Sequence, residues 1–328
     1  MSSSIITAFV SSLIYAPGAF YFYPWKPLVQ FVFGDPYPVG FNFFGRDHSD
    51  PTNVALHFVG LVWQVLGNFG LLGALDAQAF GTTSSLGRLR PLSFLSATLW
   101  TGVLLLSPAP WPVSVLSAVI IFGAFEVSAV LGPHELEVGC AAAFVAVLLA
   151  TYSLRGKRVA HLLSGLALTS SYFGLAFGAS AAASRWRGTF AGEGYDRKLN
   201  AALVVLMLLI GMLPKPMIPA TVAGVLLVRI VGELTHQDIL LYWGIAFLAQ
   251  LSQGVSHKVT RQEATLLNHE KDDSHTRRAK LAFEISHVCY FPNLLLHVCY
   301  EQLVSGTSFA TTVATARATK KSSMGKKK

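Results

Sequence analysis

The chain has 328 residues, of which 52% are apolar and only 13% are charged. Soluble domains usually carry ~25% charged residues, so this composition excludes an ordinary soluble enzyme. The net charge of +8 comes from lysines and arginines in short connectors and in a terminal TKKSSMGKKK segment, which is typical of the flanks of membrane spans and excludes a nucleic-acid-binding face.

Apolar blocks separated by polar or proline-rich connectors follow one another along the chain, and they predict an all-α, polytopic membrane helix bundle. A helix needs about 20 residues to cross a hydrocarbon core of ~30 Å, which is near the length of these blocks. We therefore expect about 8 to 10 transmembrane helices. The candidate spans cover residues 4–22, 53–75, 92–107, 112–131, 136–153, 159–183, 199–213, 217–232, 239–256 and 281–304.

No connector is long and apolar enough to fold by itself, so the sequence predicts a single membrane domain over residues 1–310 and a basic, disordered tail over 311–328. The first block lacks a preceding basic region, which favours a first span or a membrane-inserted segment over a cleaved signal peptide. Basic clusters flank the last span on both sides. That span is therefore re-entrant or broken at Pro292, or one cluster does not follow the positive-inside rule.

Prolines mark several helix boundaries. In HSDPTN, before the second span, Asp50 or Thr52 is placed to cap a helix, and Pro51 suits its first turn. The SPAPWP segment has three closely spaced prolines, Pro108 to Pro112, which cannot sit inside one helix. It therefore predicts the boundary between two spans.

The ten histidines are the most informative polar residues, because imidazoles in or near a bilayer pair, bind metal or line a polar cavity. If a helix starts at Pro51, His48 lies on its approach and His57 about two turns in. The turn can bring both imidazoles to one site, where the Asn53 amide can orient a ring or a bound molecule. The alternative is a capped helix start with unrelated histidines, since two histidines make an incomplete metal shell.

A second polar cluster ends the span at 239–256. Gln250, Gln253 and His257 follow i, i+3, i+7 spacing and share one helical face. A polar stripe at the end of an apolar helix is costly if it faces lipid, so we expect it to face a protein interior or a cavity. An interfacial cap that meets water is the alternative.

The two clusters together resemble a known family. GRDHSDPTNVALHFVG resembles the pattern H-x-N-P-x-N-x-x-x-H, and QGVSHKVTRQEATLL resembles a later Q-x-x-G-H segment. Both patterns belong to the endoplasmic-reticulum membrane 2-hydroxy fatty acid dioxygenases, the family named for the metabolism of phytosphingosine to odd-numbered fatty acids. The ending FPNLLLHVCYE is also similar to that family's closing segment.

The chain is similar to a divergent member with a long central insertion. Its family-like segments cover about 40–75 and 240–304, and the apolar insertion at about 76–235 has no assigned role. Asp50 stands where the family usually has Asn, and Ser256 stands where Gly would precede the histidine.

The resemblance implies an iron(II) centre at the membrane that binds molecular oxygen and a long-chain 2-hydroxy fatty acid and releases carbon dioxide with a chain one carbon shorter. Imidazoles suit iron, and oxygen activation needs open coordination positions. Asn53 would fix a ring or a substrate oxygen, and Asp50 is a candidate extra ligand. The residues implicated as metal ligands are His48, His57 and His257, with His287 and His297 as weaker candidates.

Two other classes of protein remain open at this point. A non-catalytic subunit of a larger membrane complex would retain the same fold without the chemistry. A small-solute transporter is suggested by the number of spans and by the charged residues Glu126, Arg229 and Glu233 within apolar blocks. However, Arg229 and Glu233 form a self-neutralising i, i+4 pair, and the sequence has no convincing inverted repeat.

Overall fold

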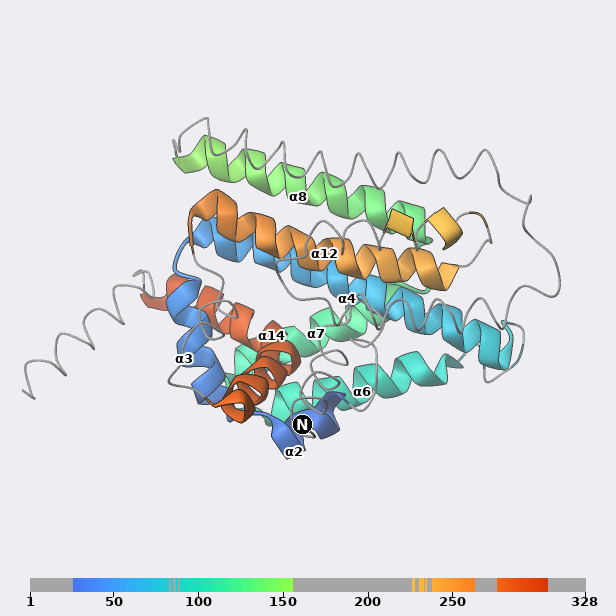
Figure 1. The fold of residues 1–328 in the computed structure, drawn as a ribbon, viewed down its shortest axis with the longest axis horizontal. Helices are drawn as coiled ribbons and strands as arrows, with labels where there is room; N and C mark the ends of the chain where they lie inside the picture. The colour runs from blue at the N-terminus through green and yellow to red at the C-terminus, as the bar shows by residue number, and fades with distance from the viewer. Residues whose placement is uncertain are drawn as a thin grey trace, which may run out of the picture.

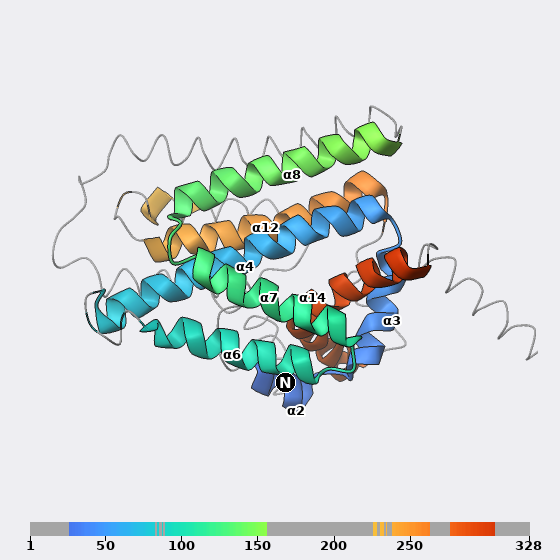
Figure 2. The same cartoon turned by 180° about the vertical axis from the view of Figure 1, so that it is seen from behind.

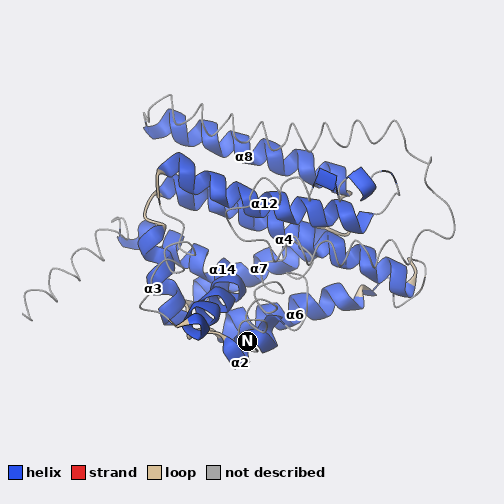
Figure 3. Ribbon diagram, viewed as in Figure 1, coloured by secondary structure: helices blue, strands red, loops and turns tan. Residues whose placement is uncertain are grey.

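A computed structural model describes residues 26–82, 84, 87, 89–155, 226–227, 230–232, 234, 238–262 and 276–305. Every regular element in this part of the chain is an α-helix (Figure 3), which confirms the predicted all-α class. The elements are α2 (Lys26–Phe33), α3 (Tyr37–Asp47), α4 (Pro51–Phe80), α6 (Pro91–Leu106), α7 (Trp111–Val127), α8 (Pro133–Arg155), α12 (Asp238–Thr260) and α14 (Arg277–Ser305).

Six of the predicted spans coincide with helices α4, α6, α7, α8, α12 and α14. Proline in the first turn starts α4, α6 and α7, where its missing N–H has no helical partner to lose. As predicted, Asp50 caps α4, since its Oδ1 accepts a hydrogen bond of 2.7 Å from the Thr52 amide. The spans predicted over 4–22, 159–183, 199–213 and most of 217–232 lie outside the described residues, as does the tail.

Two helices in the described part of the chain have the length and apolar composition needed to cross a bilayer: α4 (Pro51–Phe80) and the Pro133–Ala150 part of α8. Helices α6 and α7 are apolar but have only 16 and 17 residues. Much of α4 is buried by protein, as a core helix of a soluble protein would be. The two helices are compatible with association with a membrane, and a bundle of about 8 to 10 spans stays a prediction.

Helices α4 and α12 form an antiparallel pair along the middle of the molecule (Figure 1). Gly67 allows the two backbones to approach closely, because a Cβ at that position would lie 3.0 Å from the Ala246 amide nitrogen. At Gly60, about two helical turns nearer the start of α4, a Cβ would lie 3.1 Å from the Gln253 side chain. Small residues at such positions are typical of tightly packed helix pairs.

The other helices cover this pair on two sides. Helix α8 runs along one side, and α6, α7, α14 and α3 lie on the other (Figures 1 and 2). The described part of the predicted insertion thus supplies α6, α7 and α8, which pack against α4. The largest apolar cluster joins Phe69 of α4 with Trp100 of α6, Ile121 of α7 and Leu294 of α14.

Helix α14 extends from Arg277 to Ser305 with Pro292 inside it, and its two parts run in different directions in Figure 1. Proline removes one helical N–H donor and distorts the preceding turn. In that turn, the Trp100 indole N–H donates a hydrogen bond of 2.8 Å to the Cys289 carbonyl. The adjacent Asn293 amide donates to the Leu104 carbonyl at 2.8 Å and to Ser107 Oγ at 2.7 Å. These bonds attach the proline-containing turn to the α6–α7 corner.

Buried polar contacts also fix the far end of α4, the end remote from His48. Asp76 is fully buried, and its carboxylate accepts hydrogen bonds from the Leu92 amide at 2.8 Å and from the Ser93 amide at 3.0 Å. Arg90 donates to the Phe125 carbonyl at 2.7 Å and to Ser128 Oγ at 3.0 Å. Asp76 therefore caps the start of α6, and Arg90 caps the end of α7.

Candidate metal centre

Three histidines meet at the end of the α4–α12 pair where α3 leads into α4, at the left of Figure 1. His48 follows α3, His57 lies in the second turn of α4, and His257 lies in the last turn of α12. Their ring centroids are 4.6, 5.0 and 4.8 Å apart, and their nearest candidate ligand atoms all lie within 4.8 Å of one another. All three are buried. The structure thus brings together the three residues that the family resemblance requires.

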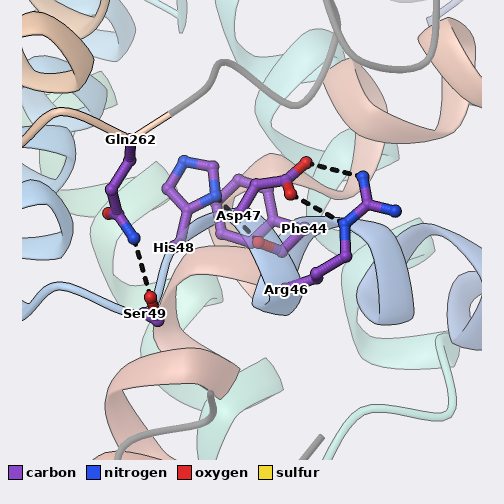
Figure 4. A network of polar contacts seen from close by, with 6 residues as sticks. All are labelled: Phe44, Arg46, Asp47, His48, Ser49 and Gln262. Atoms are coloured by element: carbon purple, nitrogen blue, oxygen red, sulfur yellow. Dashed lines mark hydrogen bonds and ion pairs between the residues drawn. The ribbon is translucent and has the colours of Figure 1, made fainter. Parts of the chain in front are cut away.

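Backbone carbonyls orient two of the rings. His48 Nδ1 lies 2.8 Å from the Phe44 carbonyl oxygen (Figure 4), and His57 Nδ1 lies 3.0 Å from the Asn53 carbonyl oxygen. A carbonyl only accepts hydrogen bonds, so each Nδ1 is the protonated nitrogen and each Nε2 carries a lone pair. His48 Nε2 is buried and has no hydrogen-bond partner among the described residues. This donor set fits a metal ion, which binds imidazole nitrogens of this kind.

Asn53 and Ser256 support His57 from the two helices of the central pair. Ser256 Oγ donates a hydrogen bond of 2.7 Å to Asn53 Oδ1 and lies 2.9 Å from His57 Nδ1. Both residues are fully buried. Ser256 is the position at which the sequence departs from the family's glycine, and its hydroxyl adds a contact to the ring. Sequence reasoning treated it as a departure and did not identify this contact.

Gln262, just beyond α12, is a further residue that sequence reasoning missed. Its Oε1 accepts a hydrogen bond of 2.9 Å from the Asn53 amide, and its Nε2 donates one of 2.7 Å to Ser49 Oγ (Figure 4). These bonds join the end of α12 to the turn between His48 and α4. No sequence signal identified Gln262, because it follows the left-handed residue Arg261 outside any helical pattern.

The surroundings keep His48 and His257 neutral. Burial lowers the pKa of His48 well below its usual range, and the neighbouring imidazoles lower it further. Burial lowers the pKa of His257 to about 4, although the nearby Asp47 carboxylate opposes this shift. Asp47 is in turn held by Arg46, which contacts its two oxygens at 2.8 and 3.0 Å (Figure 4). Because a metal binds deprotonated imidazole, the lone pairs are available at neutral pH.

The remaining predicted site residues lie outside the three-histidine group. The Asp50 side chain caps α4. His297 Nδ1 lies 3.0 Å from the Tyr37 hydroxyl, and its ring stacks on Phe41 at 3.8 Å. The His287 ring lies 5.4 Å from the Phe44 ring, on the edge of the centre.

Of the three charged residues that suggested transport, the structure describes one. Glu126 is exposed on α7, whereas Arg229 and Glu233 lie outside the described residues, as does the Gln250 side chain. Gln253, which belongs to the predicted polar face of α12, donates a hydrogen bond of 3.3 Å from its Nε2 to Gln64 Oε1 of α4.

Fold and site together define an α-helical protein with a buried three-histidine site suited to a metal ion. Comparisons with known protein families, with curated proteins and with solved structures gave no match. We therefore infer the function of the protein from the geometry of the site and from the sequence patterns.

Proposed function

We propose that this chain is a membrane-associated, iron(II)-dependent dioxygenase that shortens long-chain 2-hydroxy fatty acids by one carbon. The observation that supports this proposal most is the convergence of His48, His57 and His257. These residues come from the two separate segments that resemble the family, and they lie 4.6 to 5.0 Å apart by ring centroid. By the same resemblance we propose the endoplasmic-reticulum membrane as the location.

The atoms and electrons of the proposed reaction balance without a reductant other than the 2-hydroxy acid itself. A 2-hydroxy acid and molecular oxygen give the carboxylic acid one carbon shorter, carbon dioxide and water. The bond between C1 and C2 breaks, the two carbons together lose four electrons, and oxygen accepts all four. Bound iron supplies the redox chemistry and the open coordination positions that this reaction needs.

The chain's own residues orient the donor atoms and exclude water. The Phe44 and Asn53 carbonyls hold the Nδ1 protons of His48 and His57, so the opposite nitrogens stay unprotonated. Burial of all three rings keeps bulk water from the centre.

The position of the centre also suits a lipid substrate. His57 lies in the second turn of α4, a helix long and apolar enough to cross a bilayer. A site at the start of a membrane-crossing helix would lie at the membrane surface, where a 2-hydroxy carboxylate head group could enter while its acyl chain stays in lipid.

Metal analysis of the protein purified in mild detergent tests the proposal. We expect about one iron per chain and conversion of 2-hydroxypalmitate to the acid with one carbon fewer, followed by mass spectrometry. His48→Ala, His57→Ala and His257→Ala should each remove most of the iron and the activity. His134→Ala, at an exposed position of α8, is the control and should change neither.

Three outcomes separate the alternatives. A wild-type protein without bound metal refutes the metal centre. Bound iron that depends on the three histidines, with no turnover of any 2-hydroxy acid, refutes the enzyme and favours a non-catalytic subunit. Turnover that survives all three substitutions refutes the assignment of the site.

A further inference from the structure

His287 of α14 lies among aromatic rings beside the three-histidine centre. Its ring centroid is 5.4 Å from Phe44, 5.9 Å from Phe283 and 5.7 Å from Phe291. Its Nδ1 is buried and has no hydrogen-bond partner among the described residues. A buried polar atom without a partner costs about 1–3 kcal/mol and is rare in folded proteins. This nitrogen is therefore suited to a partner that arrives with a bound molecule.

Two phenylalanines link His287 to the centre. The Phe44 ring stacks on His48 at 3.8 Å, and the Phe291 ring lies 6.2 Å from that of His57. His287 also lies close enough to His48, His57 and His257 to interact with each electrostatically. It nevertheless stands outside the group whose ligand atoms lie within 4.8 Å of one another. His287 thus adjoins the centre without belonging to its set of metal ligands.

We propose that His287 binds the metal's exchangeable ligand, and that its Nδ1–H donates a hydrogen bond to the carboxylate of the bound 2-hydroxy acid. This inference rests on the proposed function and deepens it by naming the residue that recognises the acid group. A carboxylate oxygen only accepts hydrogen bonds, so this contact requires the His287 tautomer with its proton on Nδ1. The phenylalanine side chains around His287 cannot donate a hydrogen bond to a carboxylate. On this side of the centre, the imidazole therefore supplies the polar contact.

The test uses the full-length protein in detergent, loaded with Co(II) as a spectroscopic probe. Cobalt binding is followed by its visible absorption, and 2-hydroxyoctanoate or 1,2-octanediol is then titrated into the loaded protein. The two probes have similar chains, but only the first carries a carboxylate.

We expect His287→Phe to keep wild-type cobalt affinity and to bind 2-hydroxyoctanoate about 10- to 100-fold more weakly, because a hydrogen bond to a charged group is lost. Binding of the diol should change less than about 3-fold. His287→Asn should recover part of the affinity, since its amide can donate near the position of Nδ1. His297→Phe, on the same helix but outside the centre, is the control and should match the wild type.

Other results overturn the inference. Loss of cobalt from both His287→Phe and His287→Asn, with folded protein by circular dichroism, makes His287 a metal ligand. Unchanged affinity for the acid in both variants removes its binding role. A wild-type protein that binds no cobalt refutes the proposed metal centre and this inference together, whereas the other two outcomes leave the centre intact.

Discussion

The two ends of α4 both bury polar groups, but they satisfy them in different ways. At the far end, the Asp76 carboxylate and the Arg90 guanidinium bond to the termini of α6 and α7. At the near end, His48 and His57 bond to backbone carbonyls through Nδ1, while His48 Nε2 and the neighbouring His287 Nδ1 have no described partner.

This difference distinguishes a structural polar cluster from a group of side chains that could bind an ion. Asp76 and Arg90 replace hydrogen bonds that the helix ends would otherwise lack, so their protein partners account for their burial. His48 and His57 each orient the ring through a hydrogen bond at Nδ1, so Nε2 keeps a lone pair that a metal ion could bind. The partners of each buried nitrogen are therefore more informative than the number of buried polar residues.

The largest effect is expected from Asp76→Ala at the structural end. The substitution leaves the Leu92 and Ser93 amides and the Ser93 hydroxyl without their acceptor, and should lower the free energy of unfolding by about 3 kcal/mol. Thermal unfolding in detergent measures the loss. Asp76→Asn keeps one acceptor oxygen and should lose less. If the folded Asp76→Ala protein also loses its metal, the two ends of α4 are not independent.

A smaller effect is expected from Gly67→Ala, between the two ends. The added Cβ would lie 3.0 Å from the Ala246 nitrogen and 3.2 Å from the Ile245 side chain, so α12 must shift. We expect a loss of about 2 kcal/mol in stability, together with weaker metal binding, because α12 carries His257. The control is Gly123→Ala, where a Cβ meets no atom within 4 Å. Equal stability of the two variants would contradict the tight packing of α4 on α12.

The smallest effect is expected from Ser256→Ala at the histidine end. Loss of the hydroxyl removes its bond to Asn53 and its contact with His57, and should weaken metal binding about 10-fold with little change in stability. Competition with a chelator measures the affinity. Ser252→Ala is matched, since that buried hydroxyl bonds to the Ala249 carbonyl of its own helix. An equal loss in both variants would argue against a role for Ser256 in orienting the ring.

Proline and apolar length predicted the helices well, because both act locally. Pro51 and its Asp50 cap mark the start of α4, and the prolines around Ala109 separate α6 from α7. Pro292 was less informative, since the helix continues through it and Trp100 bonds to the preceding turn. Whether proline ends a helix depends there on packing, which the local sequence does not contain.

The candidate site was predictable where spacing and resemblance agree, as for His48, His57 and His257. Its supporting residues were not. Ser256 and Gln262 act through contacts with residues about 200 positions away, and Ser256 departs from the pattern that drew attention to its neighbour. The pairing of α4 with α12 creates these contacts, and no single segment encodes that pairing.

The residues of the histidine centre come from both sides of the long central region. Ser256, for example, contacts His57, which lies 199 positions earlier in the chain. During synthesis, His48 and His57 emerge well before α12 exists, and two imidazoles form an incomplete shell. An ion can be held firmly only after α12 has docked on α4. Metal loading would therefore mark completed assembly of the protein, and the ion would then act as a cross-link that opposes separation of the two helices.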